Sequence, residues 1–323
     1  MQRCKIDNAY HYASIYGQME VVQWLNKIIP MNDVSNNNQH AFQNACENGH
    51  LELAKWLLQI EPTIDISAYN ETAFTYACSY GHLEVAKWLL QFKPDIDISA
   101  KHEHAFRYAC LYKHLDVAQW LFQIKPTINI SIDTWVEYDE YDVEYANEDE
   151  FAFRHACRNG DLKMVQWLLQ IKPDINIHIL NEQPFRDVCN NGYLELAQFL
   201  HQFNPNIDIS AEDEFAFRMA CKKGNLEVAQ WLVQLKPDIY SIEVNDGIIT
   251  PTIMKLLNIT EIVERSEHIL CTICTETNSD IETMCKHSFC TGCIVKWRNK
   301  NKNTCPYCRQ SMGNEFNKIQ YLS

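Results

Sequence analysis

An internal repeat constrains this sequence more than any other feature. An aromatic residue recurs at a constant step of 32, interrupted by a single step of 47: Trp24, Trp56, Trp88, Trp120, Trp167, Phe199 and Trp231. Proline recurs with the same steps: Pro30, Pro62, Pro94, Pro126, Pro173, Pro205 and Pro237. The spacing therefore predicts seven repeats and one insertion of 15 residues.

Each repeat has the pattern of two helices joined by a tight turn, and residues 73–99 are the clearest copy. Apolar residues at helical spacing predict a first helix that ends near Gly81, a residue suited to a left-handed helix end. A second helix is predicted from His82 to Phe92, and Pro94 cannot continue it. The residues after Pro94 alternate in polarity, which predicts an extended segment. One such unit cannot bury its own apolar face, so the pattern indicates stacked repeats.

Residues 81–90, GHLEVAKWLL, resemble the second helix of the ankyrin repeat. That family has a period of about 33 residues. The resemblance implies an all-α repeat solenoid over residues 1–239 that binds a target protein. The family's TPLH turn signature is mostly replaced, and only the segment from Gln183 to Arg186 keeps its proline. Lys113 replaces the repeat glycine. The amino-acid sequences of the repeats also resemble those of ankyrin proteins of large DNA viruses of amoebae.

One cysteine stands at the same position in six of the repeats: Cys46, Cys78, Cys110, Cys157, Cys189 and Cys221. Cysteines a whole repeat apart suit neither a metal cluster nor a disulfide, so we expect small buried side chains. The histidines that begin the second helices, His50, His82 and His114, are expected to cap or bridge. The tryptophans are expected to pack.

The insertion, about residues 133–150, is acidic and contains no basic residue. Its acids are Asp133, Glu137, Asp139, Glu140, Asp142, Glu144, Glu148, Asp149 and Glu150. Acidic runs are usually solvated, so one reading is a disordered loop. The other reading is a target-contact loop, because Trp135, Tyr138, Tyr141 and Tyr145 are interleaved with the acids.

The formal charge of −14 is unevenly spread. Residues 261–323 hold seven acids and eight bases, which leaves −15 on residues 1–260 and disfavours nucleic acid as their partner. No run approaches the roughly 18 apolar residues of a membrane span, so we expect no membrane partner. The segment from Met1 to Gly17 lacks a signal-peptide pattern. We therefore expect a reducing intracellular compartment: the cytoplasm, or the host cytoplasm if the protein is viral.

The remaining cysteines, Cys4 excepted, form one constellation near the C-terminus. It contains seven cysteines and one histidine: Cys271, Cys274, Cys285, His287, Cys290, Cys293, Cys305 and Cys308. Eight soft ligands with three CxxC pairs predict two tetrahedral zinc sites. A disulfide knot would need an oxidising compartment. The spacing permits either two consecutive sites or two interleaved ones.

The ligand order, C3HC4, resembles the RING finger over residues 268–312 and predicts a small zinc-stabilised α+β domain. The resemblance implies interleaved ligation, with Cys271, Cys274, Cys290 and Cys293 on one zinc and the other four ligands on the second. It also implies a surface that binds a ubiquitin-charged E2 enzyme, formed by Ile273, Trp297, Pro306 and Arg309. Every cysteine of the module is then a zinc ligand, so transfer would be non-covalent.

These motifs favour a RING-type E3 ubiquitin ligase whose ankyrin array holds the target. The alternative is a non-catalytic scaffold with a structural zinc module. Residues 240–267 lose the repeat register and are predicted to form a cap and linker. Residues 313–323 form a tail with a short strand pattern. The tail either packs on its own RING or frays, or it pairs two RINGs as in inhibitor-of-apoptosis proteins.

Overall fold

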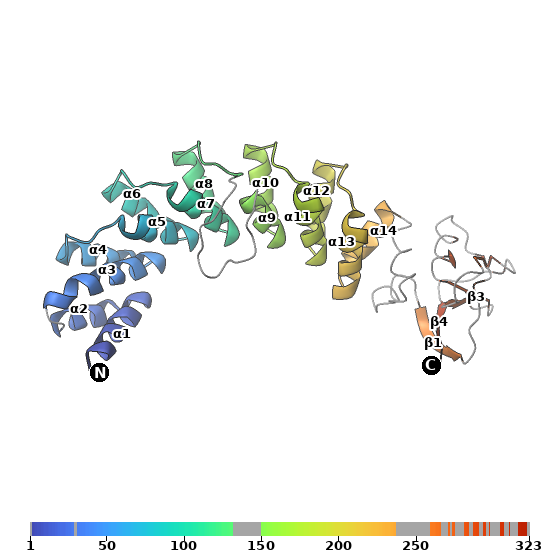
Figure 1. Ribbon diagram of the computed structural model, residues 1–323, viewed down its shortest axis with the longest axis horizontal. Coiled ribbons are helices and arrows are strands. Elements are labelled where there is room, and N and C mark those ends of the chain that lie inside the picture. The colour runs from blue at the N-terminus through green and yellow to red at the C-terminus, as the bar shows by residue number, and fades with distance from the viewer. Residues whose placement is uncertain are drawn as a thin grey trace. The chain divides into compact units, whose positions relative to one another are not determined.

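The computed structural model describes residues 2–28, 31–131, 150–236, 259–265, 271, 273–274, 281–283, 287–290, 293–294, 297, 304–306, 310 and 316–321. The chain divides into two compact units, Met1–Asn176 and Ile177–Ser323. Figure 1 labels the helices and strands along the chain. All the secondary-structure elements described in the first unit are helices. The second unit contains both helices and strands. Residues 132–149, which hold all of the expected acidic insertion except Glu150, lie outside the described residues, as do residues 240–258 of the expected cap and linker.

The helices come in consecutive pairs, as the repeat predicts. The first unit contains α1 (Gln2–Ile15), α2 (Met19–Ile28), α3 (Met31–Glu47), α4 (Leu51–Ile60), α5 (Ala68–Ser79), α6 (Leu83–Phe92), α7 (Ala100–Leu111), α8 (Leu115–Ile124), α9 (Phe151–Arg158) and α10 (Leu162–Ile171). The second unit contains α11 (Ile179–Asn190), α12 (Leu194–Phe203), α13 (Ala211–Lys223) and α14 (Leu226–Leu235). None of the described helices is long and apolar enough to cross a membrane.

The core between the helices repeats with the sequence. Six of the seven first helices bury one phenylalanine fully: Phe42, Phe74, Phe106, Phe153, Phe185 and Phe217. The remaining one, α1, buries Tyr10 at the same position. The six repeat cysteines are buried, as expected of small packing side chains, and burial raises the pKa of the Cys78 thiol. Phe74 contacts Trp120 of the following repeat, with ring centroids 6.3 Å apart. Trp88, Trp167 and Trp231 contact the preceding repeat in the same way, which confirms the packing role for these four tryptophans, whereas Trp24 is 59% exposed.

Where the structure describes the segment after a second helix, that segment is not a strand. Residues 93–99 form two tight turns instead of the expected extended segment. The alternation of polarity still sets burial, because Ile64 and Ile66 of the equivalent segment are 7% and 6% exposed. The period-2 pattern was correct about which residues face inward. It was wrong about an extended segment, because the backbone turns at residues 94–95 and again at residues 98–99.

The repeat histidines bridge neighbouring repeats and do not cap. His50, His82 and His114 occupy N-cap positions, yet none of their side chains accepts a cap hydrogen bond. His50 Nε2 lies 2.7 Å from the Ile15 carbonyl oxygen of the preceding repeat. The imidazole also covers that repeat's glycine: a Cβ on Gly17 would lie 2.5 Å from the His50 ring. The bridging expectation is confirmed for His50, and the capping alternative is wrong.

The first helices of four repeats begin with three consecutive left-handed residues, none of them glycine. These turns are residues 69–71, 101–103, 180–182 and 212–214. In the last three, an arginine one helical turn later donates to their carbonyl oxygens. Arg107 Nε donates to His102 O at 2.8 Å, and Arg186 Nε donates to Asn181 O at 2.9 Å. These turns directly precede the segment that replaces the TPLH signature, as residues 180–182 precede Gln183 to Arg186. The family resemblance holds while the local turn differs.

A buried glutamate ends each left-handed turn and ties it to the next repeat. Glu71, Glu103, Glu182 and Glu214 are 5–8% exposed. Backbone N–H groups of the following loop donate to these carboxylates, for example Asp97 N to Glu71 at 3.5 Å and Asn129 N to Glu103 at 3.4 Å. A buried carboxylate is costly unless it is paired. A serine and a lysine complete the group, as in Ser210, Glu214 and Lys236, whose Nζ lies 2.5 Å from Glu214 Oε1. We call this set the Ser–Glu–Lys clamp.

The sequence varies this clamp in a correlated way. In the second repeat, Gln39 replaces the glutamate and Glu61 replaces the lysine. The Gln39 amide both donates to Asp65 O and accepts from Asp65 N, each at 2.9 Å. A neutral amide fulfils the backbone bonds and requires no cation, which explains why the lysine is absent there.

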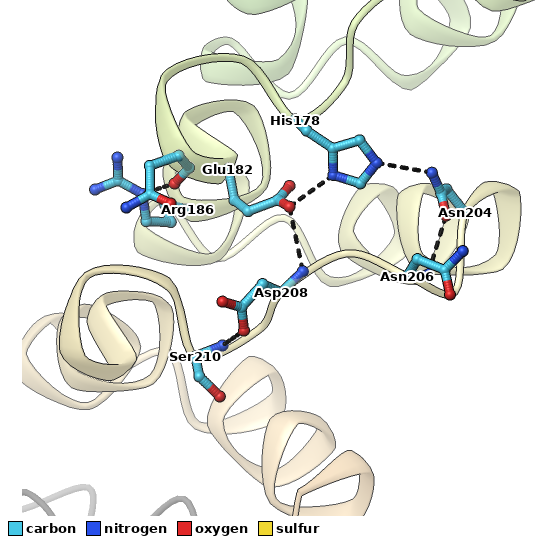
Figure 2. A network of polar contacts seen from close by, with 8 residues as sticks. His178, Glu182, Arg186, Asn204, Asn206, Asp208 and Ser210 are labelled. Atoms are coloured by element: carbon cyan, nitrogen blue, oxygen red, sulfur yellow. Dashed lines mark hydrogen bonds and ion pairs between the residues drawn. The ribbon is translucent and has the colours of Figure 1, made fainter.

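The sixth repeat uses a different set, which Figure 2 shows. His178 replaces the serine, and its Nδ1 lies 2.6 Å from Glu182 Oε1. Asn204 replaces the lysine, and its Nδ2 lies 2.9 Å from His178 Nε2. Asp208 N donates to Glu182 Oε1 at 3.2 Å, as its equivalents do elsewhere. The link to the loop is kept, but the set has no ammonium group.

Glu150 belongs to the clamp of the fifth repeat, although the sequence suggested that it lies in a solvated insertion. It is 5% exposed, accepts from Asn176 N at 3.1 Å and lies 3.8 Å from Lys172 Nζ. Its position is that of Glu103 displaced by a full repeat plus the insertion. Its inclusion among the acids of the loop was wrong.

The second unit also contains one four-stranded sheet. The strands are β1 (Ile259–Arg265), β2 (Ile281–Thr283), β3 (Ser288–Phe289) and β4 (Phe316–Tyr321), in the order β1-β4-β2-β3. β4 pairs in parallel with β1 and antiparallel with β2. The strand expected in the tail is therefore present, and it lies inside the sheet. Together with the helix pairs, this supports the predicted α solenoid plus a small α+β domain.

Candidate metal centre

Four cysteines converge from two separate segments of the second unit. The Sγ atoms of Cys271, Cys274, Cys290 and Cys293 all lie within 4.8 Å of one another. Cys271 and Cys274 flank a turn, whereas Cys290 directly follows β3. Among the described residues this is the one cluster with metal-ligand geometry. Two CxxC pairs therefore meet, although other candidate ligands lie between them in the sequence.

The cluster fits zinc in size and chemistry. A tetrahedron of thiolates at the usual Zn–S distance of about 2.3 Å has edges of about 3.8 Å. Cys274 Sγ and Cys290 Sγ are 3.8 Å apart, far longer than a disulfide bond. Burial, followed by hydrogen bonds and charge from neighbouring thiols, raises the pKa of Cys293. Such a group of thiols requires a cation before all four can ionise.

The second expected ligand set is only partly described. Cys285 and Cys308 lie outside the described residues, so His287 and Cys305 alone can be placed. His287 N donates to Thr283 Oγ1 at 3.2 Å, and Thr283 N donates to His287 O at 3.0 Å. Cys305 is fully buried, and its N–H donates to Gln310 O at 2.8 Å. Both candidate ligands thus sit on backbone that is held by hydrogen bonds.

The residues expected to bind a partner lie close in sequence to these ligands. Ile273 lies in the turn between two clustered cysteines and is 43% exposed. Trp297 is half-buried, and its Nε1 donates to Thr304 O at 2.7 Å, which fixes the indole beside the segment that carries Pro306. Pro306 is half-buried and directly follows Cys305. Arg309 lies outside the described residues.

Sequence reasoning missed the residues that support the ligands. Thr283 is 1% exposed and closes the β2–β3 hairpin around His287. Ile281 and Phe289 pair across that hairpin and are buried, and Ile294 is also buried. The ligand spacing carries no information about threonine. The apolar residues could have been found, because each stands within four positions of a candidate ligand in an otherwise polar segment.

Comparison with known proteins matches both parts of the sequence to families. The model for ankyrin repeats (3 copies) matches residues 44–133 and 153–246, and that for ankyrin repeats (many copies) matches residues 10–58. The model for the zinc finger, C3HC4 type (RING finger), matches residues 271–308, the span of the eight candidate ligands. The gap between the two ankyrin matches coincides with the insertion.

Individual relatives match over short segments. Human "E3 ubiquitin-protein ligase CBL-C" is 42% identical over 41 residues, which are 12% of this chain and 9% of that protein. Human "RING finger protein 141" is 45% identical over 42 residues, 13% of this chain and 18% of that protein. "E3 ubiquitin-protein ligase RNFT1" of Xenopus laevis is 44% identical over 50 residues, 15% and 12% respectively. The chain thus matches less than a fifth of the length of each of these relatives.

The ankyrin matches follow the observed helix pairs and together cover more than half of the chain. The RING match covers the four-thiol cluster and the hairpin that carries His287. The chain therefore belongs to the ankyrin-repeat proteins and carries a C3HC4 RING finger near its C-terminus.

Proposed function

We propose that this protein is a RING-type E3 ubiquitin ligase of the cytoplasm, or of the host cytoplasm if it is viral. The observation that supports this most directly is Ile273, an apolar side chain 43% exposed in the turn between two clustered cysteines. An exposed isoleucine held on a rigid metal-bound turn suits a shallow protein-binding surface. Two of the relatives matched over short segments are themselves named E3 ubiquitin-protein ligases.

The module binds two zinc ions in this proposal. Cys271, Cys274, Cys290 and Cys293 hold one, and Cys285, His287, Cys305 and Cys308 hold the other. Zinc supplies a fixed scaffold and takes no part in ubiquitin transfer. Much of the folding free energy of so small a module would come from metal binding.

The surface formed by Ile273, Trp297, Pro306 and Arg309 binds the E2 enzyme in its ubiquitin-charged form. No cysteine of the module remains to accept ubiquitin, so the ligase acts by positioning. It orders the E2–ubiquitin conjugate so that a lysine of the target attacks the E2 thioester. The ankyrin array holds the target protein.

The test is ubiquitin transfer by the full chain with a panel of E2 enzymes. We expect activity with at least one E2, and loss of that activity in Ile273→Ala and Arg309→Ala with zinc content unchanged at two per chain. Ile124→Ala is the matched control, because Ile124 is 38% exposed on α8 of the ankyrin array. Full activity in both RING variants would show that the proposed surface does not bind the E2 enzyme.

The alternative function is a non-catalytic scaffold, in which the RING is a zinc-stabilised interaction module. It predicts two bound zinc ions, capture of a target by the array, and neither E2 binding nor transfer. Titration of the full chain with each E2 distinguishes the two functions even before a target is known. Pairing of two RINGs through the tail is a separate expectation, tested by the molar mass of the full chain at high concentration.

A further inference from the structure

The strand β4 lies inside the sheet and has partners on both sides. On one side Lys318 pairs with Ile262 of β1, and on the other side it pairs with Ile281 of β2. A second chain that added a strand here would need a free edge, and neither edge of β4 at this position is free. The backbone of residues 316–318 therefore serves its own domain, whereas residues 319–321 are paired with β1 only.

The pairing connects β4 to candidate zinc ligands through short steps. Phe316, Asn317 and Lys318 pair with Thr283, Glu282 and Ile281 of β2. β2 in turn pairs with β3, with Ile281 opposite Phe289 and Glu282 opposite Ser288. β3 is flanked directly by His287 and Cys290, one candidate ligand of each proposed zinc site.

The hairpin between these ligands is buried, so a displacement of β2 is transmitted to them and not absorbed. Ile281 and Thr283 are 1% exposed, and Phe289 is fully buried. Thr283 holds His287 by three hydrogen bonds of 3.0, 3.1 and 3.2 Å. A strand as short as β2 is marginally stable with β3 alone. β4 supplies its other neighbour.

We propose that β4 is a positioning element of the zinc module, which fixes the β2–β3 hairpin and thereby sets His287 and Cys290 at coordinating distance. The inference rests on the proposed function for its catalytic consequence: ubiquitin transfer depends on residues 316–321 of the same chain, through zinc retention. Residues 316–318 of the tail thus act within their own RING and offer no free edge to a strand of a second RING.

The test compares two substitutions at one position of the full chain. Lys318→Pro removes a ladder N–H in a strand paired on both sides, whereas Lys318→Ala keeps the backbone and removes only the side chain. We expect roughly a hundredfold weaker zinc retention against a chelator in Lys318→Pro and wild-type retention in Lys318→Ala. Equal retention in both variants would overturn the proposal.

A second measurement separates positioning from general unfolding. Cobalt can replace zinc, and its absorption distinguishes a four-thiolate site from a site with three thiolates and one imidazole. We expect Lys318→Pro to change the spectrum of the His287 site, and we expect helix content to stay unchanged because α1–α14 lie outside the sheet. For a chain lacking residues 316–323, a peptide of these residues added in excess should restore the spectrum. Failure of that rescue with an unchanged spectrum in Lys318→Pro would also overturn the proposal.

The two proposals fail separately. If the wild-type chain transfers no ubiquitin while Lys318→Pro still loses zinc, the ligase function is wrong and the positioning role stands. If the wild-type chain is active and Lys318→Pro retains both zinc and activity, the positioning role is wrong and the ligase function stands.

Discussion

Single residues in this array carry constraints that cross from one repeat to the next. Gly81 adopts φ +81°, and an added Cβ would lie 2.3 Å from Nδ1 of His114 in the following repeat. One pair of neighbouring repeats in this chain has neither the glycine nor the histidine. There Lys113 occupies the glycine position with φ 69°, and Asp161 occupies the histidine position of the following repeat. Asp161 then caps α10 by accepting from Met164 N at 3.1 Å. The glycine and the histidine thus depend on each other.

Gly81→Ala should destabilise the array by about 2–4 kcal/mol, because a left-handed alanine and an overpacked imidazole both cost free energy. In Gly81→Ala with His114→Asp, the steric part of this cost should disappear, leaving about 1–2 kcal/mol from the backbone. Urea unfolding of the wild type, both single variants and the double variant measures the coupling. Strictly additive effects would mean that the two positions do not interact.

His104 should make the array sensitive to mild acid. Burial, and then the charges of Arg107 and Lys101, lower the pKa of His104 to about 4. The imidazole is neutral in the folded chain, whereas the unfolded chain binds a proton near pH 6.5. Stability is therefore complete above pH 6.5 and falls as the pH drops toward 4, by about 2 kcal/mol between pH 7 and 5.

This loss should be absent in His104→Gln, which cannot titrate, and should persist in His102→Asn, which changes an exposed histidine of the same helix. The measurement is the free energy of unfolding in urea at pH 7 and pH 5 for all three chains. An identical pH dependence in wild type and His104→Gln would show that His104 is not the group responsible.

At the scale of one helix–turn–helix element, the repeat pattern predicted the helices and their buried residues but not the turns between repeats. The helix pairs, the buried cysteines and the packed tryptophans follow from period and polarity. The left-handed turns do not, because their residues, such as Tyr69 and Lys101, have no strong preference for positive φ. The buried glutamates were also missed, since a charged residue beside a turn is ordinarily exposed. Their recurrence in register with the repeat, usually with a lysine following the next helix, was the available signal.

The sixth repeat should be the weakest of these elements, because its buried carboxylate, unlike the neutral Gln39 amide of the second repeat, has no ammonium group beside it. His178→Ser with Asn204→Lys restores the set found at Ser99, Glu103 and Lys125 and should stabilise the second unit by about 1 kcal/mol. The reverse exchange, Ser99→His with Lys125→Asn, should destabilise the first unit by a similar amount. Hydrogen exchange in α13 and α7 locates each effect. Unchanged exchange in both variants would show that the lysine adds nothing to the carboxylate's backbone bonds.

At the scale of the whole molecule, the sequence predicted two modules and their families, and both are confirmed. It could do so because each module depends on spacing: a constant repeat step in one and eight metal ligands in the other. The sequence did not predict the four-stranded sheet formed by β1, β4, β2 and β3. β1 ends at Arg265 and β4 begins at Phe316, and no local sequence pattern indicates that two segments so far apart in the chain pair with each other. The sequence of the tail indicated a strand, but it did not indicate that the strand pairs with β1 and β2.

The insertion interrupts an otherwise constant repeat step, and its removal tests whether the array needs it. Deleting Asp133 to Asn147 restores the constant repeat step, so that Ser131, Glu150 and Lys172 acquire the spacing of the other clamps. Because Glu150 already occupies its clamp position, the shortened chain should unfold in one cooperative transition at a temperature equal to or above that of the wild type. If the acidic and aromatic residues contact a target, capture of cellular partners should fall at the same time. Loss of the cooperative transition would instead show that the insertion supports the fold, and unchanged capture with an intact transition would identify it as a solvated loop.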